Sequence, residues 1–277
     1  MVVSTQWKIR HKPASRTLPP MTETETAVLT EERDGVLIIT INRPDARNSV
    51  NGAVAQGLAD AVARLDASED LRVGILTGAG GYFCSGMDLK AFMRGELPFL
   101  EDGGFAGIAK KGPKKPLIAA IEGFAVAGGM EIALACDLIV AAEGAKLGIP
   151  EAKRNLVAAG GALLRLPNRI PFHVAMELAL TGDPISAERG YEVGLVNVVA
   201  PAGSTVDAAL ELAGRITVNG PLAVYASKEI LTKAVDWSEA EGWDAQEAIV
   251  APVFTSEDAQ EGALAFAEKR DPVWKGR

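Results

Sequence analysis

Histidine and cysteine are the scarcest reactive residues in this chain of 277 amino acids, with two of each. Two cysteines, Cys84 and Cys136, are too few for a disulfide framework at this length, which favours a reducing, cytoplasmic location. Two histidines exclude a histidine-rich metal site, and we expect no bound metal. His173 lies in an ordinary helical pattern over residues 172–180, so a histidine-dependent triad is not expected. The chemistry is therefore expected to use other acids and bases.

Positive charge and aromatic rings are also in short supply. The formal net charge is −8 and aromatic residues make up 5% of the chain, whereas a nucleic-acid groove needs clustered cations and usually stacking rings. The most apolar stretch, residues 117–142, is interrupted by Glu122, Glu131 and Asp137, which indicates a buried core rather than a membrane span. We expect a small-molecule ligand, with neither a nucleic acid nor a membrane as partner.

Several familiar motifs are missing as well. The sequence has no G-x-x-x-x-G-K-[ST] phosphate loop and no G-x-S-x-G nucleophile elbow. A dinucleotide fingerprint beginning at Gly78 and Gly80 fails because Phe83 stands where the third glycine belongs. The sequence therefore lacks the usual markers of phosphoryl transfer, dinucleotide redox chemistry and serine hydrolysis.

Acidic residues are absent from the first twenty positions, which carry four cations and the pair Pro19-Pro20. Removing those four charges from a total of −8 leaves −12 for the remainder. The prolines would break an amphipathic helix, so we expect residues 1–20 to be an unstructured basic extension. The alternative is a targeting segment, which would make the location mitochondrial.

From residue 21 to about residue 200, short β-type runs alternate with helical patterns. One apolar helix face is marked by the recurrence of Val54, Leu58 and Leu65. Strands separated by helices predict an α/β core with crossover connections, and the purely helical pattern after residue 200 predicts a helical region over 201–277. The predicted strands are residues 36–41, 73–77, 117–121, 138–141 and 195–199.

The most informative stretch has two glycines followed by a helix-forming run. Gly128 and Gly129 would present free backbone N–H groups at a positive helix end, where a developing oxyanion is stabilised. Glu131 falls in the first turn of that helix, and Glu151 supplies a second carboxylate after a short extended segment. Two acids flanking an oxyanion site suit proton and water transfer at an activated carbonyl. Alternatively, Glu131 merely stabilises a helix end and Glu151 is a surface acid.

Several separated motifs together resemble the enoyl-CoA hydratase/isomerase (crotonase) superfamily. The resemblance covers nearly all of the chain after Met21 and implies a spiral of repeated ββα turns followed by a C-terminal helical region that builds trimers, commonly paired into hexamers. The family's usual triple glycine reads Ala127-Gly128-Gly129 here. The motifs are Asn42-Arg43-Pro44, Ser85-Gly86-Met87-Asp88-Leu89, residues 118–137, Gly148-Ile149-Pro150-Glu151, Leu180-Thr181-Gly182-Asp183, Gly194-Leu195-Val196 and residues 265–270.

The resemblance also assigns roles to residues of this chain. It implies that the backbone N–H groups of Ser85 and Gly128 hold the thioester oxygen, that Glu131 activates water, and that Glu151 exchanges the proton at the α-carbon. Coenzyme A would enter as the acyl carrier of the substrate, with no metal or redox cofactor. Asn155 stands where a glycine is common, and asparagine tolerates the left-handed backbone that a glycine can adopt.

Cations and one aromatic ring are the candidates for contacts with coenzyme A. Arg47 and Lys90 would offset the acidic balance near the phosphates, whereas Phe266 and Lys269 would approach coenzyme A bound to a neighbouring subunit. The C-terminal residues 256–277 resemble most the family members of carnitine metabolism, which act on crotonobetainyl-CoA. A trimethylammonium group would need an acid or an aromatic face, and the loop 93–112 offers Glu96, Phe99, Glu101, Asp102 and Phe105.

Both glutamates favour a hydratase, because members of the superfamily that only shift a double bond often keep a single acid at the position of Glu151. We therefore predict an acyl-CoA hydro-lyase that adds or removes water across the 2,3 double bond. The alternatives are an enoyl-CoA isomerase or another crotonase-type enzyme and, from a different class, a non-catalytic module that binds acyl-CoA or RNA. The acidic balance weighs against RNA.

Overall fold

A six-stranded sheet forms the centre of the fold in the computed structural model, which describes residues 26–277. The predicted extension, residues 1–20, lies outside the described residues. Five strands run parallel and only the edge strand β1 is antiparallel to its neighbour, so the core has the crossover α/β topology expected. The strand order is β1 (Val28–Arg33), β2 (Val36–Ile41), β3 (Val73–Gly78), β6 (Leu117–Ile121), β8 (Leu138–Ala142) and β11 (Val198–Ala200).

A smaller sheet and a hairpin complete the strand arrangement. The smaller sheet has the order β10 (Ile185–Ser186), β9 (Lys146–Gly148) and β7 (Phe124–Val126), and the hairpin joins β4 (Phe99–Leu100) to β5 (Gly104–Phe105). The chain passes from β6 to β7 and into helix α3 (Gly128–Ala135), and then from β8 to β9. Because β6 pairs with β8 and β7 pairs with β9, each successive pair of strands along the chain adds one strand to the large sheet and one to the smaller sheet. This is the predicted ββα spiral.

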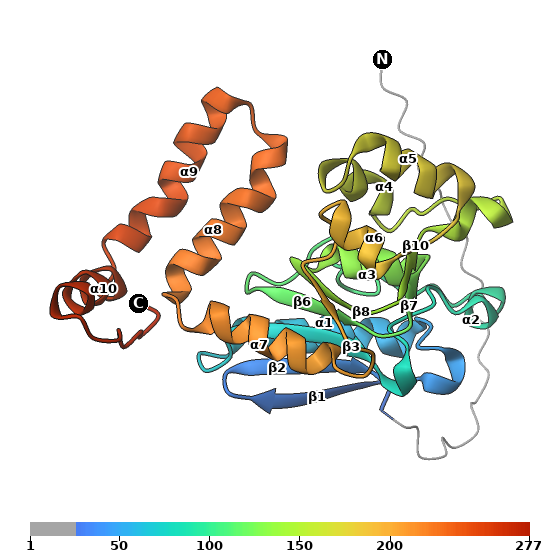
Figure 1. Cartoon of the computed structure of the whole chain (residues 1–277), viewed down its shortest axis with the longest axis horizontal. Coiled ribbons are helices and arrows are strands. Elements are labelled where there is room, and N and C mark those ends of the chain that lie inside the picture. Colours follow the sequence, from blue (N-terminus) through green and yellow to red (C-terminus); the bar gives the residue numbers. More distant parts are fainter. Residues whose placement is uncertain (1–25) are drawn as a thin grey trace, which may run out of the picture.

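The large sheet is apolar on both faces, because both are covered. On β2, Leu37, Ile39 and Ile41 belong to the larger core cluster, which includes helix α1 (Gly52–Ala67), whereas Val36 belongs to a second cluster with Ala209 and Ala213 of helix α7 (Thr205–Thr217). Figure 1 shows the sheet between these two helices. Helix α7 is therefore part of the core. The region 201–277, which is predicted to build oligomers, thus also contributes to the packing of the sheet.

Helix α1 begins after Asn51, whose side chain accepts a hydrogen bond from Val54 N–H at 3.1 Å.

We predict that Leu58→Ala, which empties a fully buried position on helix α1, lowers the free energy of unfolding by about 2–5 kcal/mol in urea titrations. The exposed neighbour Gln56 provides the control, because Gln56→Ala should change that energy by no more than about 0.5 kcal/mol. Equal effects of the two substitutions would contradict this view of the core.

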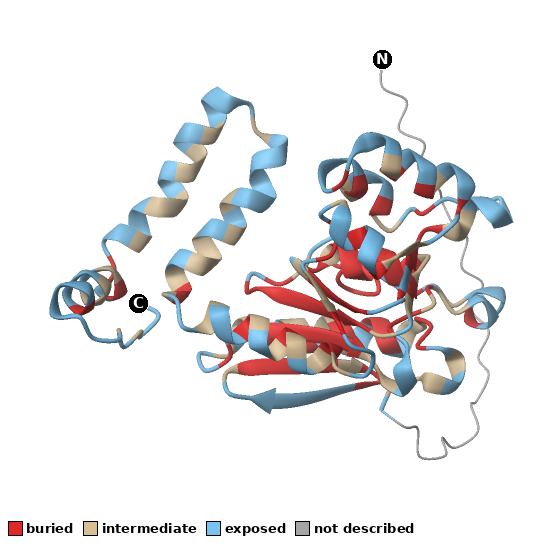
Figure 2. Ribbon diagram, viewed as in Figure 1, coloured by how far each residue is buried: buried red, intermediate tan, exposed pale blue. Residues whose placement is uncertain are grey.

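The last three helices form an arm that projects from the core (Figure 1): α8 (Pro221–Lys233), α9 (Glu239–Phe254) and α10 (Glu257–Glu268). Helix α9 buries none of its residues, and Trp243, Phe254 and Phe266 on the arm are 65%, 77% and 88% exposed. Figure 2 shows the arm almost without buried residues, in contrast to the core. The arm is tied to the core where the Lys228 ammonium meets the Asp137 carboxylate at 2.6 Å.

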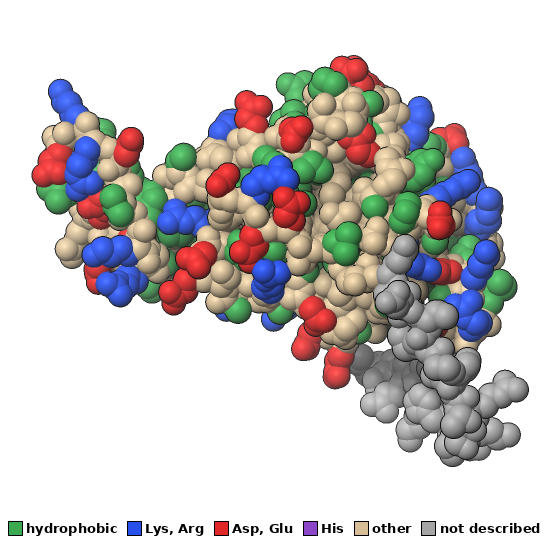
Figure 3. Space-filling model, turned by 90° about the horizontal axis from the view of Figure 1, so that it is seen from below, with side chains coloured by type: hydrophobic (Ala, Val, Ile, Leu, Met, Phe, Trp, Pro, Cys, Tyr) green, Lys and Arg blue, Asp and Glu red, His purple; other side chains and the backbone are tan. Residues whose placement is uncertain are grey.

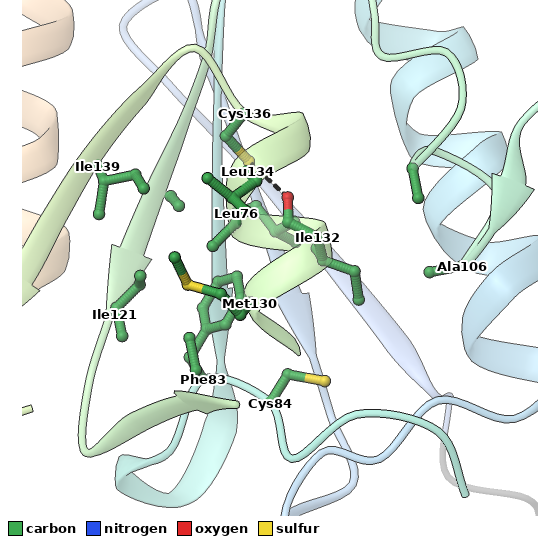
Figure 4. Packing of buried hydrophobic residues seen from close by; sticks show 14 of the residues in the cluster. Leu76, Phe83, Cys84, Ala106, Ile121, Met130, Ile132, Leu134, Cys136 and Ile139 are labelled. Carbon is green, nitrogen blue, oxygen red and sulfur yellow. Dashed lines mark hydrogen bonds between the residues drawn. The ribbon is translucent and has the colours of Figure 1, made fainter. Parts of the chain in front are cut away.

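Both cysteines lie in the apolar core. Figure 4 shows Cys84 and Cys136 among buried side chains such as Phe83, Met130 and Leu134, and neither cysteine is exposed or bonded to the other. Burial raises the pKa of the Cys84 thiol to about 12 and also raises the pKa of Cys136. Their only polar contacts among the described residues are weak, such as the bond from Gly86 N–H to Cys84 Sγ at 3.4 Å and from Cys136 Sγ to Ile132 O at 3.5 Å.

The surface mixes charges of both signs. On the face shown in Figure 3, acidic and basic side chains are interspersed over the core and the arm. Across residues 26–277, no helix combines the length and apolar character needed to cross a membrane. In the same part of the chain, no three His, Cys, Asp or Glu side chains are grouped so that they could hold a metal ion.

Candidate active site

The N-terminus of α3 presents a free backbone donor. Ala127 has a φ of 53° and a ψ of −131°, a positive-φ conformation that glycine adopts readily, and its N–H donates to Gly148 O at 3.0 Å. The Ala127 carbonyl then accepts the N–H groups of Met130 and Glu131. The Gly128 N–H has no acceptor among the described residues and lies at the positive end of the helix. This is the geometry expected of Gly128.

The second expected donor, Ser85, is already in use. Its N–H donates to Arg47 O at 3.1 Å, so it is unavailable to a ligand and the expectation for Ser85 is corrected. Two further bonds hold this segment to the loop before α1, from Val50 N–H to Gly86 O at 2.8 Å and from Asp88 N–H to Val50 O at 2.9 Å. These two bonds make a parallel β-bridge between Val50 and Met87. In such a bridge the N–H of Met87 points away from the loop, and it has no acceptor within residues 26–277.

Met87 and Gly128 therefore provide the free amide pair. Gly86, with a φ of 98°, packs against the start of α3 so closely that a methyl group on it would lie 3.0 Å from Gly128 N and 2.9 Å from Ala127 Cβ. This contact brings the two amides to the same place. The motif at residues 85–89 identified the right segment but the wrong residue, because the bonds of this segment to the loop before α1 decide which N–H is left free.

Glu131 is a buried carboxylate, 4% exposed, on the first turn of α3. Its Oε1 accepts a hydrogen bond from Ala162 N–H at 3.3 Å, and a methyl group on Gly160 would lie only 2.5 Å from its Oε2. Burial raises the pKa of Glu131 above its ordinary value, and the negative charge of Glu151 raises it further, whereas the bond from Ala162 opposes the shift. The two acids therefore share one site.

Glu151 lies in the short helix η3 (Pro150–Arg154), which follows β9. Its Oε2 is buried without a hydrogen-bond partner in the described part of the chain, and burial raises the pKa of this carboxyl. The helix ends at Asn155, whose φ of 55° confirms the expected left-handed position. An unpaired buried carboxyl oxygen is free to bind a substrate atom.

A hollow of about 1420 Å³ opens beside these groups, between the core and α8. Phe105 and Gly160 line it, and each touches the site: a methyl on Gly128 would lie 2.5 Å from Phe105 Cζ, and Gly160 contacts Glu131. Apolar side chains of Leu164 and Leu231 form part of its wall. The hollow therefore adjoins the site through Phe105 and Gly160, although the two amides and the two acids do not themselves line it.

None of the three acids expected to meet a trimethylammonium group lines a pocket wall in this loop. Glu96 accepts a hydrogen bond from Gly52 N–H at 2.7 Å at the start of α1, and Glu101 and Asp102 are exposed in the turn between β4 and β5. The rings of Phe99 and Phe105 lie 5.5 Å apart, and both line the hollow. Within this loop, aromatic rings rather than carboxylates line the hollow.

The predicted coenzyme A contacts divide into two groups. Arg47 and Lys90 are exposed on the two segments that bond to each other around Ser85. Phe266 and Lys269 lie at α10, on the side of the molecule opposite α2 (Leu89–Met93) in Figure 1. One chain therefore does not bring the two groups together.

Comparisons with known proteins identify the family of the chain. Residues 31–277 match the family model described as enoyl-CoA hydratase/isomerase. The chain is 44% identical to enoyl-CoA hydratase EchA19 of Mycobacterium tuberculosis, over 90% of this chain and 96% of that protein. It is 42% identical to a carnitinyl-CoA dehydratase of Proteus mirabilis, over 88% of this chain and 97% of that protein.

Solved structures show the same fold. Enoyl-CoA hydratase EchA1 of Mycobacterium marinum superposes with a TM-score of 0.90 at 61% identity, covering 91% of this chain and all of that one. Carnitinyl-CoA hydratase of Mycobacterium avium superposes with a TM-score of 0.74 at 45% identity, covering 92% of this chain and all of that one. On the strength of the family model, these relatives and the shared fold, the chain belongs to the enoyl-CoA hydratase/isomerase (crotonase) family.

Proposed function

We propose that this protein adds or removes water across the 2,3 double bond of an enoyl-CoA thioester. The observation that carries the proposal is the pair of acids, buried Glu131 and half-buried Glu151, beside the free amides of Met87 and Gly128. The names of the relatives support it, since they include enoyl-CoA hydratases and carnitinyl-CoA dehydratases.

In the hydration direction, the thioester oxygen accepts hydrogen bonds from Met87 N–H and Gly128 N–H. The Glu131 carboxylate takes a proton from water as the water oxygen bonds to Cβ, and the electrons of the double bond move onto the thioester oxygen as an enolate. The protonated Glu151 then delivers its proton to Cα, and the proton that Glu131 took from water passes to Glu151 through solvent, which restores both acids for the next turnover. The amides stabilise charge that develops only during the reaction, which is why they accelerate it. Dehydration is the reverse.

Coenzyme A is the handle of the substrate in this proposal, and the reaction needs neither a metal nor a redox cofactor. Arg47 and Lys90 would meet its phosphates, because they are exposed beside the segment that carries Met87. Phe266 and Lys269 would come from a neighbouring subunit, since in one chain they lie at the far side of the molecule.

Hydration of a panel of enoyl-CoA thioesters tests the proposal, because water addition removes the ultraviolet absorbance of the conjugated double bond. The panel includes crotonobetainyl-CoA, since relatives are named for carnitinyl-CoA. We expect turnover with at least one thioester and one solvent oxygen in the product. Migration of the double bond without solvent oxygen would indicate an isomerase, and binding without turnover would indicate a non-catalytic acyl-CoA module.

We further propose that the arm joins copies of the chain into a trimer or a pair of trimers. The support is the apolar surface of the arm, where Trp243, Phe254 and Phe266 are exposed. Sedimentation equilibrium should give three or six times the chain mass. Replacing both Trp243 and Phe254 by serine should lower that mass, and an unchanged mass would place the contact elsewhere.

The raised pKa of Glu131 predicts how stability changes with pH. Below the ordinary carboxyl range Glu131 is protonated in both states, so Glu131→Gln and the unsubstituted protein should be about equally stable. As pH rises towards the folded pKa, the unfolded chain ionises first and the unsubstituted protein loses stability that the Gln variant keeps. Urea unfolding at pH 4 to pH 8 should show this widening gap. A gap that narrows with rising pH would contradict it.

A further inference from the structure

We propose that Asn48 is a positioning residue for the amide pair, acting through the hydrogen bonds that orient Met87. The proposal rests on the function proposed above. Asn48 is fully buried in the loop before α1, close to the segment of residues 84–88 but outside the acids and amides of the site. No step of the reaction uses its side chain.

The Asn48 side chain joins its own loop, which leads into α1, to the loop 79–83, which leads into the amide segment. Its Nδ2 donates to Ala79 O at 2.8 Å and to Tyr82 O at 2.7 Å, and its Oδ1 accepts a hydrogen bond from Arg43 N–H at 3.0 Å. Both amide donors and the acceptor are thus used inside the protein. The loop 79–83 runs directly into Cys84 and Ser85, so Asn48 sets where that segment begins.

The backbone at Asn48 controls the other side of the same segment. Arg47 and Asn48 have φ angles of 51° and 56°, two successive left-handed residues that turn the chain sharply. This turn places Arg47 O where it accepts the Ser85 N–H. Two residues further along, Val50 bonds to Gly86 and Asp88. With Ser85 and Asp88 held by their N–H groups and Gly86 by its carbonyl, the Met87 N–H is left facing the site. Losing the Asn48 side chain would free both loops at once.

Two substitutions and one matched control test this role. Asn48→Ala removes all three bonds, and Asn48→Asp keeps the acceptor but loses both donors at nearly the same volume. The control is Asn51→Ala, because Asn51 lies in the same loop and its side chain caps α1 without bonding to the segment 79–88. Thermal unfolding followed by circular dichroism identifies variants that fold.

The readouts are hydration kinetics and the absorption maximum of bound 4-(dimethylamino)cinnamoyl-CoA, which moves to longer wavelength when its carbonyl is polarised. We expect the Asn48 variants to lose about 100-fold in kcat and more than half of that shift at saturation, with KM within about 3-fold, whereas Asn51→Ala keeps kcat and the shift. A folded Asn48 variant with the full shift, or an equal loss in Asn51→Ala, would overturn the proposal. Absence of both turnover and shift in the unsubstituted protein would instead reject the proposed function.

Discussion

Replacing Glu131 by glutamine is expected to lower kcat by roughly 10²–10⁴-fold, the contribution of a positioned general base. The amide keeps the shape of the side chain but cannot take a proton from water. Because Glu131 is buried and lies against Gly160, no other carboxylate can enter its place. Glu151→Gln should lose a similar factor, since its proton would no longer reach Cα. Loss of ultraviolet absorbance from an enoyl-CoA at saturation measures both effects.

Two features separate this result from loss of folding or binding. Each variant should still bind coenzyme A thioesters with a Kd near that of the unsubstituted protein, because neither acid is a predicted coenzyme A contact. Glu131→Gln and Glu151→Gln together should cost little more than one of them, since the two acids act on one reaction. If either single variant kept full activity, the assignment of its glutamate would be wrong.

Gly86→Ala is expected to lower kcat by about 10²–10³-fold, the effect of losing one oxyanion donor. The added methyl would lie 3.0 Å from Gly128 N and 2.9 Å from Ala127 Cβ, so the two segments that carry the amides would be pushed apart. The φ of 98° adds backbone strain of about 1–3 kcal/mol, because a side chain disfavours this conformation.

Gly203 offers the matched control for Gly86. Its φ of 84° is also positive, but it lies before α7 and a methyl group there meets nothing within 4 Å. Gly203→Ala should therefore share the strain and keep kcat, which urea unfolding and steady-state kinetics on both variants would show. Equal loss of kcat in the two variants would attribute the effect to strain rather than to separation of the amides.

The periodicity of the chain was enough to predict most of the core. The β-branched run at residues 36–41 became β2 and residues 117–121 became β6, because strands buried on both faces are continuously apolar. The strands β7 and β9 have three residues each, too short for a pattern to emerge. Strand β1 has one buried residue in six, so its pattern is that of an edge rather than a core strand.

The acids of the site could also be predicted, but not the whole amide pair. Gly128 follows from glycines ahead of a helical run, which is a local signal. Met87 does not, since its free N–H depends on a bridge to Val50 and on the conformation of Gly86. The bonds of Asn48 to Ala79 and Tyr82 span more than thirty positions of the chain, and no local pattern marks such a contact.

The burial of both cysteines makes the protein suitable for site-specific labelling. Thiol reagents attack the thiolate, and Cys84 and Cys136 are shielded and held protonated at neutral pH. A single cysteine introduced at the exposed Glu69, in the loop between α1 and β3, would therefore take a fluorescent dye without removal of the native ones. Energy transfer between donor-labelled and acceptor-labelled chains would then report how fast copies exchange in solution.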